Sequence, residues 1–182
     1  FNAGHGNRID VTIDKDIVIV RDYGQGFIPN SFREDGKTVL EAAFSVLNTS
    51  GKYREDGSYE GTSLGSFGIG SKITTFLSHW LTVTTIRDEK FENCRFLEGV
   101  FDKRETGECN ELTGNKTGTR VAWQPSEEFF KNTEVEIKKI RDLFKTISCL
   151  CPGLTINLDY NGTKEVYIST NGLNDLVDDA VK

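Results

Sequence analysis

The sequence predicts one α+β domain, a two-layer α/β sandwich in which helices cover one face of a mixed, mostly antiparallel sheet. Strand-like segments occur in neighbouring pairs, as in hairpins, and the helical segments are grouped between them instead of alternating with single strands. The chain has 182 residues, of which 36% are hydrophobic and 27% charged. This size and composition suit a single packed core and argue against wholesale disorder.

The first half of the chain begins with a hairpin pattern. Apolar residues alternate over 9–13, a turn follows at 14–16, and the apolar run 17–20 predicts a second, more buried strand. Residues 38–48 predict a helix, with one apolar face formed by Val39, Ala42, Ala43, Val46 and Leu47. Residues 48–70 are polar and rich in glycine, as in a functional lid or a disordered segment. Ile73, Phe76 and Leu77 continue as a helix.

The second half alternates between strands and helices in larger blocks. Segments 80–88, 94–102 and 118–125 each read as a strand. Residues 134–150 form the clearest helix, with Ile137, Ile140, Phe144 and Ile147 in register. Segments 154–158 and 166–168 predict a last pair of strands, and the C-terminus is expected to be helical.

Charge and composition exclude several classes. The net charge of −6 argues against a surface that grips DNA on this part of the protein, although DNA contacts elsewhere stay open. No apolar run reaches membrane-spanning length. The four cysteines lack zinc-site spacing and are expected to be reduced thiols of a cytoplasmic protein. Because the chain has no Met, we interpret it as part of a longer protein.

The glycine-rich segment "GTSLGSFGIGSK", residues 61–72, does not match two familiar phosphate-binding motifs. A P-loop has Lys before Ser or Thr and follows a strand, whereas here Ser71 precedes Lys72. The dinucleotide motif has the glycine order G-x-G-x-x-G, and this segment has G-x-x-G-x-G. The glycines still admit a ligand close to the backbone, and the following helix start favours an anion. A flexible surface loop is the alternative.

A second motif, Asp22-Tyr-Gly24-Gln-Gly26, follows the second expected strand. A carboxylate at a strand end accepts hydrogen bonds from an exocyclic amine, and the glycines beside it leave room for a flat ring. Adenine has both features. An ordinary Asp-x-Gly turn is the alternative interpretation.

Together the two motifs resemble the GHKL ATPase family, whose Bergerat fold binds ATP. The resemblance is closest to the N-terminal ATPase domain of the type IIA DNA topoisomerase B subunits, those of DNA gyrase and topoisomerase IV. It extends over nearly the whole chain, in the order of the family. The matching segments are "AGHGNRIDVTID", "RDYGQGFIP", "LNTSGKY", "SLGSFGIG", "KTGTRVAWQPSEEFF" and "NGLNDLVDDAV".

The resemblance implies roles for individual residues. Asp22 is expected to bind the adenine amine, with a water held by Thr119. Gly24, Gly26, Ile28 and Pro29 are expected to line the adenine pocket. Lys52 and Tyr59 are expected on the lid. The triphosphate is expected within the glycine motif Gly65, Ser66, Phe67, Gly68, Ile69 and Gly70. Arg87 matches an arginine at the pocket rim that coumarin inhibitors contact.

Other parts of the family's machinery are expected outside residues 1–182. The Asn that holds Mg²⁺ and the Glu that acts as general base belong to a helix before Phe1, and the transducer domain belongs after Lys182. This chain alone is therefore expected to hydrolyse ATP poorly or not at all. Gln25 in place of Arg, an inserted Phe27 and Phe67 in place of His depart from the family pattern.

The implied function is that of an ATPase domain which couples ATP binding and hydrolysis to dimerisation and DNA strand passage, with the topoisomerase A subunit as partner in a cytoplasmic, nucleoid-associated enzyme. Two alternatives stay open. One is a nucleotide-binding dimerisation module without hydrolysis, and the other is a different GHKL member such as a MutL-like mismatch-repair ATPase.

Overall fold

The computed structural model describes residues 4–47, 69–109 and 117–180. The strands are β1 (Arg8–Asp14), β2 (Ile17–Asp22), β3 (Ser78–Arg87), β4 (Lys90–Leu97), β5 (Val100–Glu108), β6 (Gly118–Pro125), β7 (Thr155–Tyr160) and β8 (Thr163–Tyr167). The helices are α1 (Val39–Ser45), α2 (Gly70–Phe76), α3 (Ile137–Leu150) and α4 (Leu173–Ala180). Within the described residues, no helix is long and apolar enough to cross a membrane.

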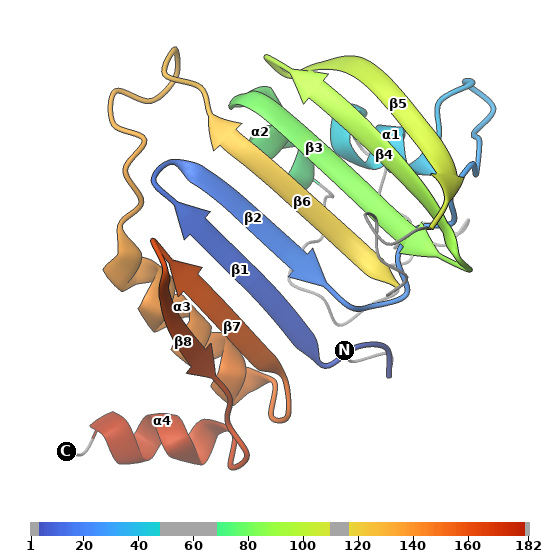
Figure 1. Ribbon diagram of the computed structural model, residues 1–182. Helices are drawn as coiled ribbons and strands as arrows, with labels where there is room; N and C mark the ends of the chain where they lie inside the picture. The colour runs from blue at the N-terminus through green and yellow to red at the C-terminus, as the bar shows by residue number, and fades with distance from the viewer. Residues whose placement is uncertain (1–3, 48–68, 110–116, 181–182) are drawn as a thin grey trace.

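All eight strands join one sheet in the order β5-β4-β3-β6-β2-β1-β7-β8. Only β1 and β7 pair in parallel among these neighbours, and the other pairs are antiparallel. Helices α1, α2 and α3 lie behind the sheet in Figure 1, which leaves the opposite face without a helical cover. The predicted α+β sandwich with a mixed, mostly antiparallel sheet is therefore confirmed.

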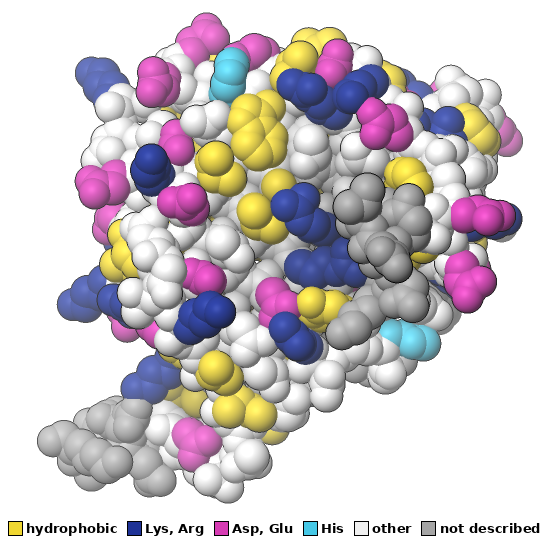
Figure 2. Space-filling model, in the orientation of Figure 1, with side chains coloured by type: hydrophobic (Ala, Val, Ile, Leu, Met, Phe, Trp, Pro, Cys, Tyr) yellow, Lys and Arg dark blue, Asp and Glu magenta, His cyan; other side chains and the backbone are white. Residues whose placement is uncertain are grey.

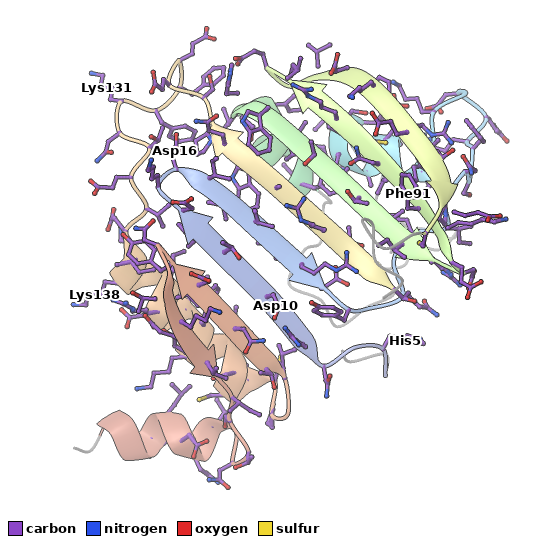
Figure 3. The ribbon with its side chains drawn as sticks, in the orientation of Figure 1. His5, Asp10, Asp16, Phe91, Lys131 and Lys138 are labelled. Carbon is purple, nitrogen blue, oxygen red and sulfur yellow. The ribbon has the colours of Figure 1, made fainter. Side chains whose placement is uncertain are left out.

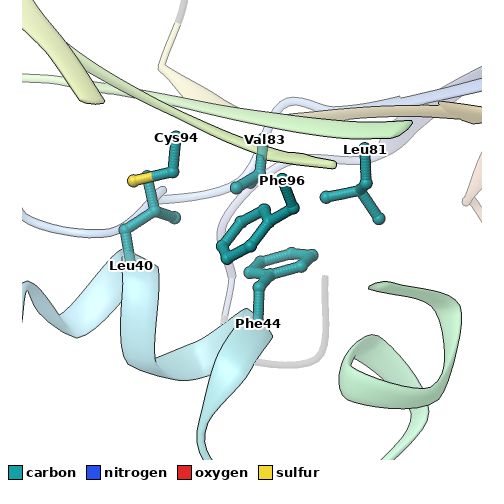
Figure 4. Close-up of a cluster of buried hydrophobic side chains, with 6 residues drawn as sticks. All are labelled: Leu40, Phe44, Leu81, Val83, Cys94 and Phe96. Atoms are coloured by element: carbon teal, nitrogen blue, oxygen red, sulfur yellow. The ribbon is translucent and has the colours of Figure 1, made fainter. Parts of the chain in front are cut away.

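The core lies between the sheet and the helices as two clusters. The first cluster joins α1 to β3 and β4 through Leu40, Phe44, Leu81, Val83, Cys94 and Phe96 (Figure 4). The second cluster lies under α3 and consists of Val11, Ile13, Leu154, Ile156 and Leu158. The apolar stripe predicted for the long helix packs against this second cluster. Between the clusters, β6 and β2 continue the sheet.

The turn between β4 and β5 corrects one prediction. Residues 94–102 read as a single strand, but the chain reverses at Glu98 and Gly99. Both residues have positive φ, 46° and 76°, which is the conformation of a two-residue hairpin turn whose twist matches its strands. Glu98 is an uncommon residue for that conformation, so the turn left a weak signal in the sequence.

The apolar face of α1 was predicted correctly only in part, because Ala42 is buried and Ala43 packs against the first cluster. The buried positions are Leu40, Glu41, Ala42 and Phe44, whereas Val39 and Leu47 are 38% and 58% exposed. Lys37 forms an ion pair with Glu41 at 2.6 Å, which allows that carboxylate to lie against the core.

The burial of the first hairpin is the reverse of the prediction. β1 contains the buried Val11 and Ile13, while every residue of β2 is half-buried. β1 lies directly in the second cluster, and β2 lies at its margin, where Val18 and Val20 pack only partly against it.

Candidate functional site

The loop that follows β2 begins with a carboxylate that fixes its first turn. Asp22 is the last residue of β2, and its Oδ1 accepts the backbone N–H of Gly24 at 2.8 Å. Gly26 has φ +66°, and a Cβ there would lie 2.8 Å from the Ile86 carbonyl oxygen and from Thr85 Oγ1. Glycine is therefore required at position 26, because the loop passes against the end of β3.

Thr85 fastens this loop to the sheet. Its hydroxyl accepts the Phe27 N–H at 2.7 Å and donates to the Phe27 carbonyl oxygen at 3.2 Å. Thr85 is fully buried, and the half-buried Phe27 ring packs against the first core cluster. Phe27, which is inserted relative to the family pattern, therefore packs against the core.

A buried carboxylate holds the far end of the same loop. Glu92 of β4 is 0% exposed and accepts the Asn30 N–H at 2.7 Å and Arg104 Nε at 3.3 Å. Arg104 also donates to Asn30 Oδ1, and its guanidinium lies 5.1 Å from the centre of the Phe32 ring. Burial, and next the charge of Glu92, raise the pKa of the neighbouring Cys94 thiol to about 12. Cys94 is therefore an inert core residue, and all four cysteines are free.

The sheet register brings Asp22 next to Thr119. Arg21 lies opposite Arg120, so the next residues, Asp22 on β2 and Thr119 on β6, are neighbours whose side chains point to the other face. Gly118 makes the approach close, because a Cβ there would lie 2.2 Å from the Asp22 carbonyl oxygen. Thr85 pairs with Thr119 on the other side. Three strands therefore present Asp22, Thr119 and Thr85 on the face covered by helices.

The described end of the glycine motif leads into α2. Ile69 is the N-cap residue and 39% exposed, and no side chain caps the helix that begins at Gly70. Lys72, in the first turn, is 2% exposed and forms no ion pair within the described residues. Burial lowers the pKa of this ammonium group. The family resemblance did not point to Lys72, although a lysine directly after a glycine-rich loop was a usable signal.

The remaining candidate residues divide between the described and the undescribed parts. Ile28 is 56% exposed and Pro29 is half-buried on the Asp22–Asn30 loop. Arg87 ends β3 next to Ile86, and its Nε lies 3.5 Å from Asp88 Oδ2. The candidates that lie outside the described residues are Lys52, Tyr59, Gly65, Ser66, Phe67 and Gly68. Among residues 4–47, 69–109 and 117–180, no cluster of three metal-ligating side chains occurs.

Comparison with known proteins identifies relatives along almost the whole chain. It is 32% identical over 178 residues to the B subunit of DNA topoisomerase 4 from Streptococcus pneumoniae, which covers 96% of this chain and 27% of the relative. It is 31% identical over 176 residues to the DNA gyrase B subunit of Thermus thermophilus, covering 94% and 27%. The B subunit of DNA topoisomerase 4 from Bacillus subtilis is 34% identical over 177 residues, covering 94% and 26%. The chain thus spans about a quarter of these relatives. No family model matches.

A solved structure agrees with these relatives in fold. The crystal structure of the 43K ATPase domain of Thermus thermophilus gyrase B, in complex with an aminocoumarin, matches with a TM-score of 0.81 and 24% identity. The match covers 100% of this chain and 45% of that chain. By these relatives, the chain belongs to the family of the B subunits of DNA gyrase and DNA topoisomerase 4.

Proposed function

We propose that this chain is the ATP-binding part of a type IIA topoisomerase B subunit. The observation that carries the proposal is the placement of Asp22 beside Thr119 on one face, above a loop that the sheet holds at both ends. One Asp22 oxygen is engaged by the Gly24 N–H, and the second is left to accept the adenine amine. Thr119 supplies a hydroxyl for the water that completes this contact.

The other candidates surround that contact. Gly24, Gly26, Ile28 and Pro29 would border the flat ring, and Arg87 would lie at the rim next to Ile86. The glycine motif from Gly65 to Gly70 would surround the triphosphate, with Lys52 and Tyr59 on the lid. We add Lys72, because a buried lysine that has no ion-pair partner among the described residues is disfavoured unless an anion compensates it, and a phosphate would do so.

We further propose that the complete protein uses this domain as the family does. ATP binding would favour dimerisation of two such domains, and hydrolysis would reset them during DNA strand passage with the A subunit in the cytoplasm. The resemblance to the family places the Asn ligand of Mg²⁺ and the general-base Glu outside residues 1–182. We therefore expect this chain alone to bind ATP with little turnover.

The test is a calorimetric titration of the chain with a non-hydrolysable ATP analogue, compared with Asp22→Asn. The Asn side chain still accepts the Gly24 N–H, so the turn is kept, while an acceptor for the adenine amine becomes a donor. We expect Asp22→Asn to weaken binding at least tenfold. Asp142→Asn, an equal change at an exposed position of α3, serves as the control and should bind like wild type.

If Asp22→Asn and wild type bind the ATP analogue with equal affinity, Asp22 does not bind the adenine amine. If neither the wild-type chain nor versions extended before Phe1 bind the ATP analogue, the proposal that this chain binds a nucleotide is wrong. Rapid ATP turnover by residues 1–182 would contradict the expected placement of the general base.

A further inference from the structure

A fully buried carboxylate on β4 lies beside the loop that follows β2. Charged side chains of both signs are mixed over the surface in Figure 2, where water solvates them. Glu92, by contrast, is 0% exposed. It shares its side of β4 with the core residues Cys94 and Phe96, whereas Phe91, labelled in Figure 3, lies on the face without helices. Glu92 forms an ion pair with Arg104 of β5, in which Nε lies 3.3 Å from Oε1.

Two cross-strand neighbours hold this loop at two points. Thr85 of β3 and Glu92 of β4 lie directly opposite each other in the register, and both are 0% exposed. Thr85 Oγ1 accepts the Phe27 N–H at 2.7 Å. Glu92 Oε2 accepts the Asn30 N–H, also at 2.7 Å. Because the sheet fixes the separation of the two anchors, the two loop residues between them span a fixed distance.

Ile28 and Pro29 are the residues between these anchors. The Pro29 ring fixes its own φ and also restricts the backbone of Ile28. Asn30, which ends the segment, has φ 59°, a left-handed conformation that Asn adopts more readily than most residues. The Ile28 side chain is 56% exposed. This stiff segment thus holds an apolar side chain out of the core, which suits contact with a flat ring.

Arg104 reinforces the second anchor. Its guanidinium bonds Glu92 Oε1 and also donates to Asn30 Oδ1, so it holds both partners of the Glu92–Asn30 contact. The guanidinium also lies 5.1 Å from the centre of the Phe32 ring. A buried ion pair adds little to stability, because desolvation of the charges offsets their attraction. Stability alone therefore does not account for this pair, whereas its position at the loop does.

We propose that Glu92 and Arg104 are positioning residues of the nucleotide site. They hold Asn30, and through it the Ile28-Pro29 segment, in the place where the segment borders the base. This inference rests on the proposed function and deepens it. With the pair in place, a nucleotide binds without first ordering this segment, which saves binding free energy.

The test replaces the pair as a unit. The double variant Glu92→Met/Arg104→Met removes both charges at similar volume, a change that is often neutral or stabilising for a buried pair. We expect its melting temperature to equal or exceed that of wild type. Its affinity for a non-hydrolysable ATP analogue, measured by calorimetry, should fall about tenfold, the cost of ordering one loop residue on binding.

Amide hydrogen exchange of the ligand-free protein gives a signature of the anchor itself. In the double variant the Asn30 N–H has lost its acceptor and should exchange faster than in wild type. The Phe27 N–H keeps its bond to Thr85 and should exchange at the wild-type rate. Weaker nucleotide binding together with a lower melting temperature and faster exchange at Phe27 would show that the pair is only structural.

A milder variant and a matched control complete the experiment. Arg104→Gln, at a side chain 25% exposed, should also weaken binding of the analogue, and it replaces the double variant if that protein does not fold. Arg95→Gln breaks the ion pair with Asp102 on the other face of the same hairpin and should bind like wild type. If wild type binds the analogue and the pair variants bind it equally well, the positioning role is wrong while the proposed function stands. If wild type does not bind, the proposed function itself is wrong.

Discussion

Lys72 illustrates how one residue links stability to function in this chain. Its side chain is almost fully covered in the first turn of α2, and no described group compensates its charge. Folding must therefore desolvate an ammonium group, which disfavours the native state. A residue that opposes folding in this way is expected where a ligand makes use of it. The glycine motif immediately before α2 is the place where the resemblance puts the triphosphate.

Replacing this lysine should separate the two effects. We expect Lys72→Met to raise the free energy of unfolding at pH 7 by about 1 kcal/mol, because an uncompensated buried charge is removed. The same change should weaken binding of the ATP analogue at least tenfold. Urea denaturation and calorimetry measure the two quantities.

The stability difference between Lys72→Met and wild type should depend on pH, and the pKa of Lys72 sets the direction of this dependence. The folded pKa of Lys72 is lower than the unfolded pKa, so the unfolded chain holds its proton more firmly and the destabilisation applies at low and neutral pH. The stability difference between Lys72→Met and wild type should therefore shrink as the pH rises toward the pKa of an unfolded lysine. A less stable variant with unchanged nucleotide affinity would show that Lys72 is only a packing residue.

At the scale of elements, apolar patterns that extend over several turns predicted the structure correctly, and those of short elements did not. α3 repeats its apolar residues over four turns, so Ile137, Ile140, Phe144 and Ile147 were sufficient to predict its buried side. α1 has seven residues, and the Lys37–Glu41 ion pair lets a charged residue face the core. The β4–β5 turn depends on the backbone of Glu98. Neither effect is visible in an apolar pattern.

The candidate site was predictable in part for a similar reason. Asp22, Gly24 and Gly26 are close together in sequence and form a local motif. The supports of that loop, Thr85 and Glu92, come from two later strands, and only the register of the sheet shows that they meet Phe27 and Asn30. Long-range pairing of this kind carries no local sequence signal.

Asp10 connects three elements and gives a test at this scale. Its carboxylate accepts bonds from Arg8 Nε at 2.7 Å, from the Tyr23 hydroxyl at 2.6 Å and from Asn157 Nδ2 at 2.7 Å. Burial alone would raise the pKa of Asp10, but the hydrogen bonds from Arg8, Asn157 and Tyr23 outweigh it and hold the pKa below its usual value. The carboxylate thereby ties β1 to β7 and to the end of β2.

We expect Asp10→Asn to lower the free energy of unfolding at pH 7 by roughly 1–3 kcal/mol, the range for hydrogen bonds to a charged group. Because the folded pKa is below the unfolded one, this stabilisation is complete above about pH 4 and is lost as the pH falls through the folded pKa. Urea denaturation from pH 7 to pH 3 measures it. The exposed Asp14→Asn is the control, and a difference that persists undiminished at pH 3 would contradict the assignment.

At the scale of the whole molecule, one sheet connects two separate cores. The first cluster lies under α1, and the second lies under α3. Four residue pairs between β2 and β6, from Val18–Trp123 to Arg21–Arg120, join the two halves. The proposed nucleotide contact of Asp22 with Thr119 lies at this junction. This site therefore needs the two halves to be folded together.

A core substitution far from the junction tests this coupling. Leu158 of β7 is 1% exposed in the second cluster, and Leu158→Ala should lower the free energy of unfolding by roughly 2–5 kcal/mol. Both tryptophans, Trp80 and Trp123, lie on β3 and β6 in the other half. If the sheet transmits the loss, tryptophan fluorescence and far-ultraviolet circular dichroism shift to the same lower urea midpoint, as in a two-state transition. If fluorescence keeps the wild-type midpoint while circular dichroism shifts, the halves unfold independently, and a ligand at the junction would have to hold them together.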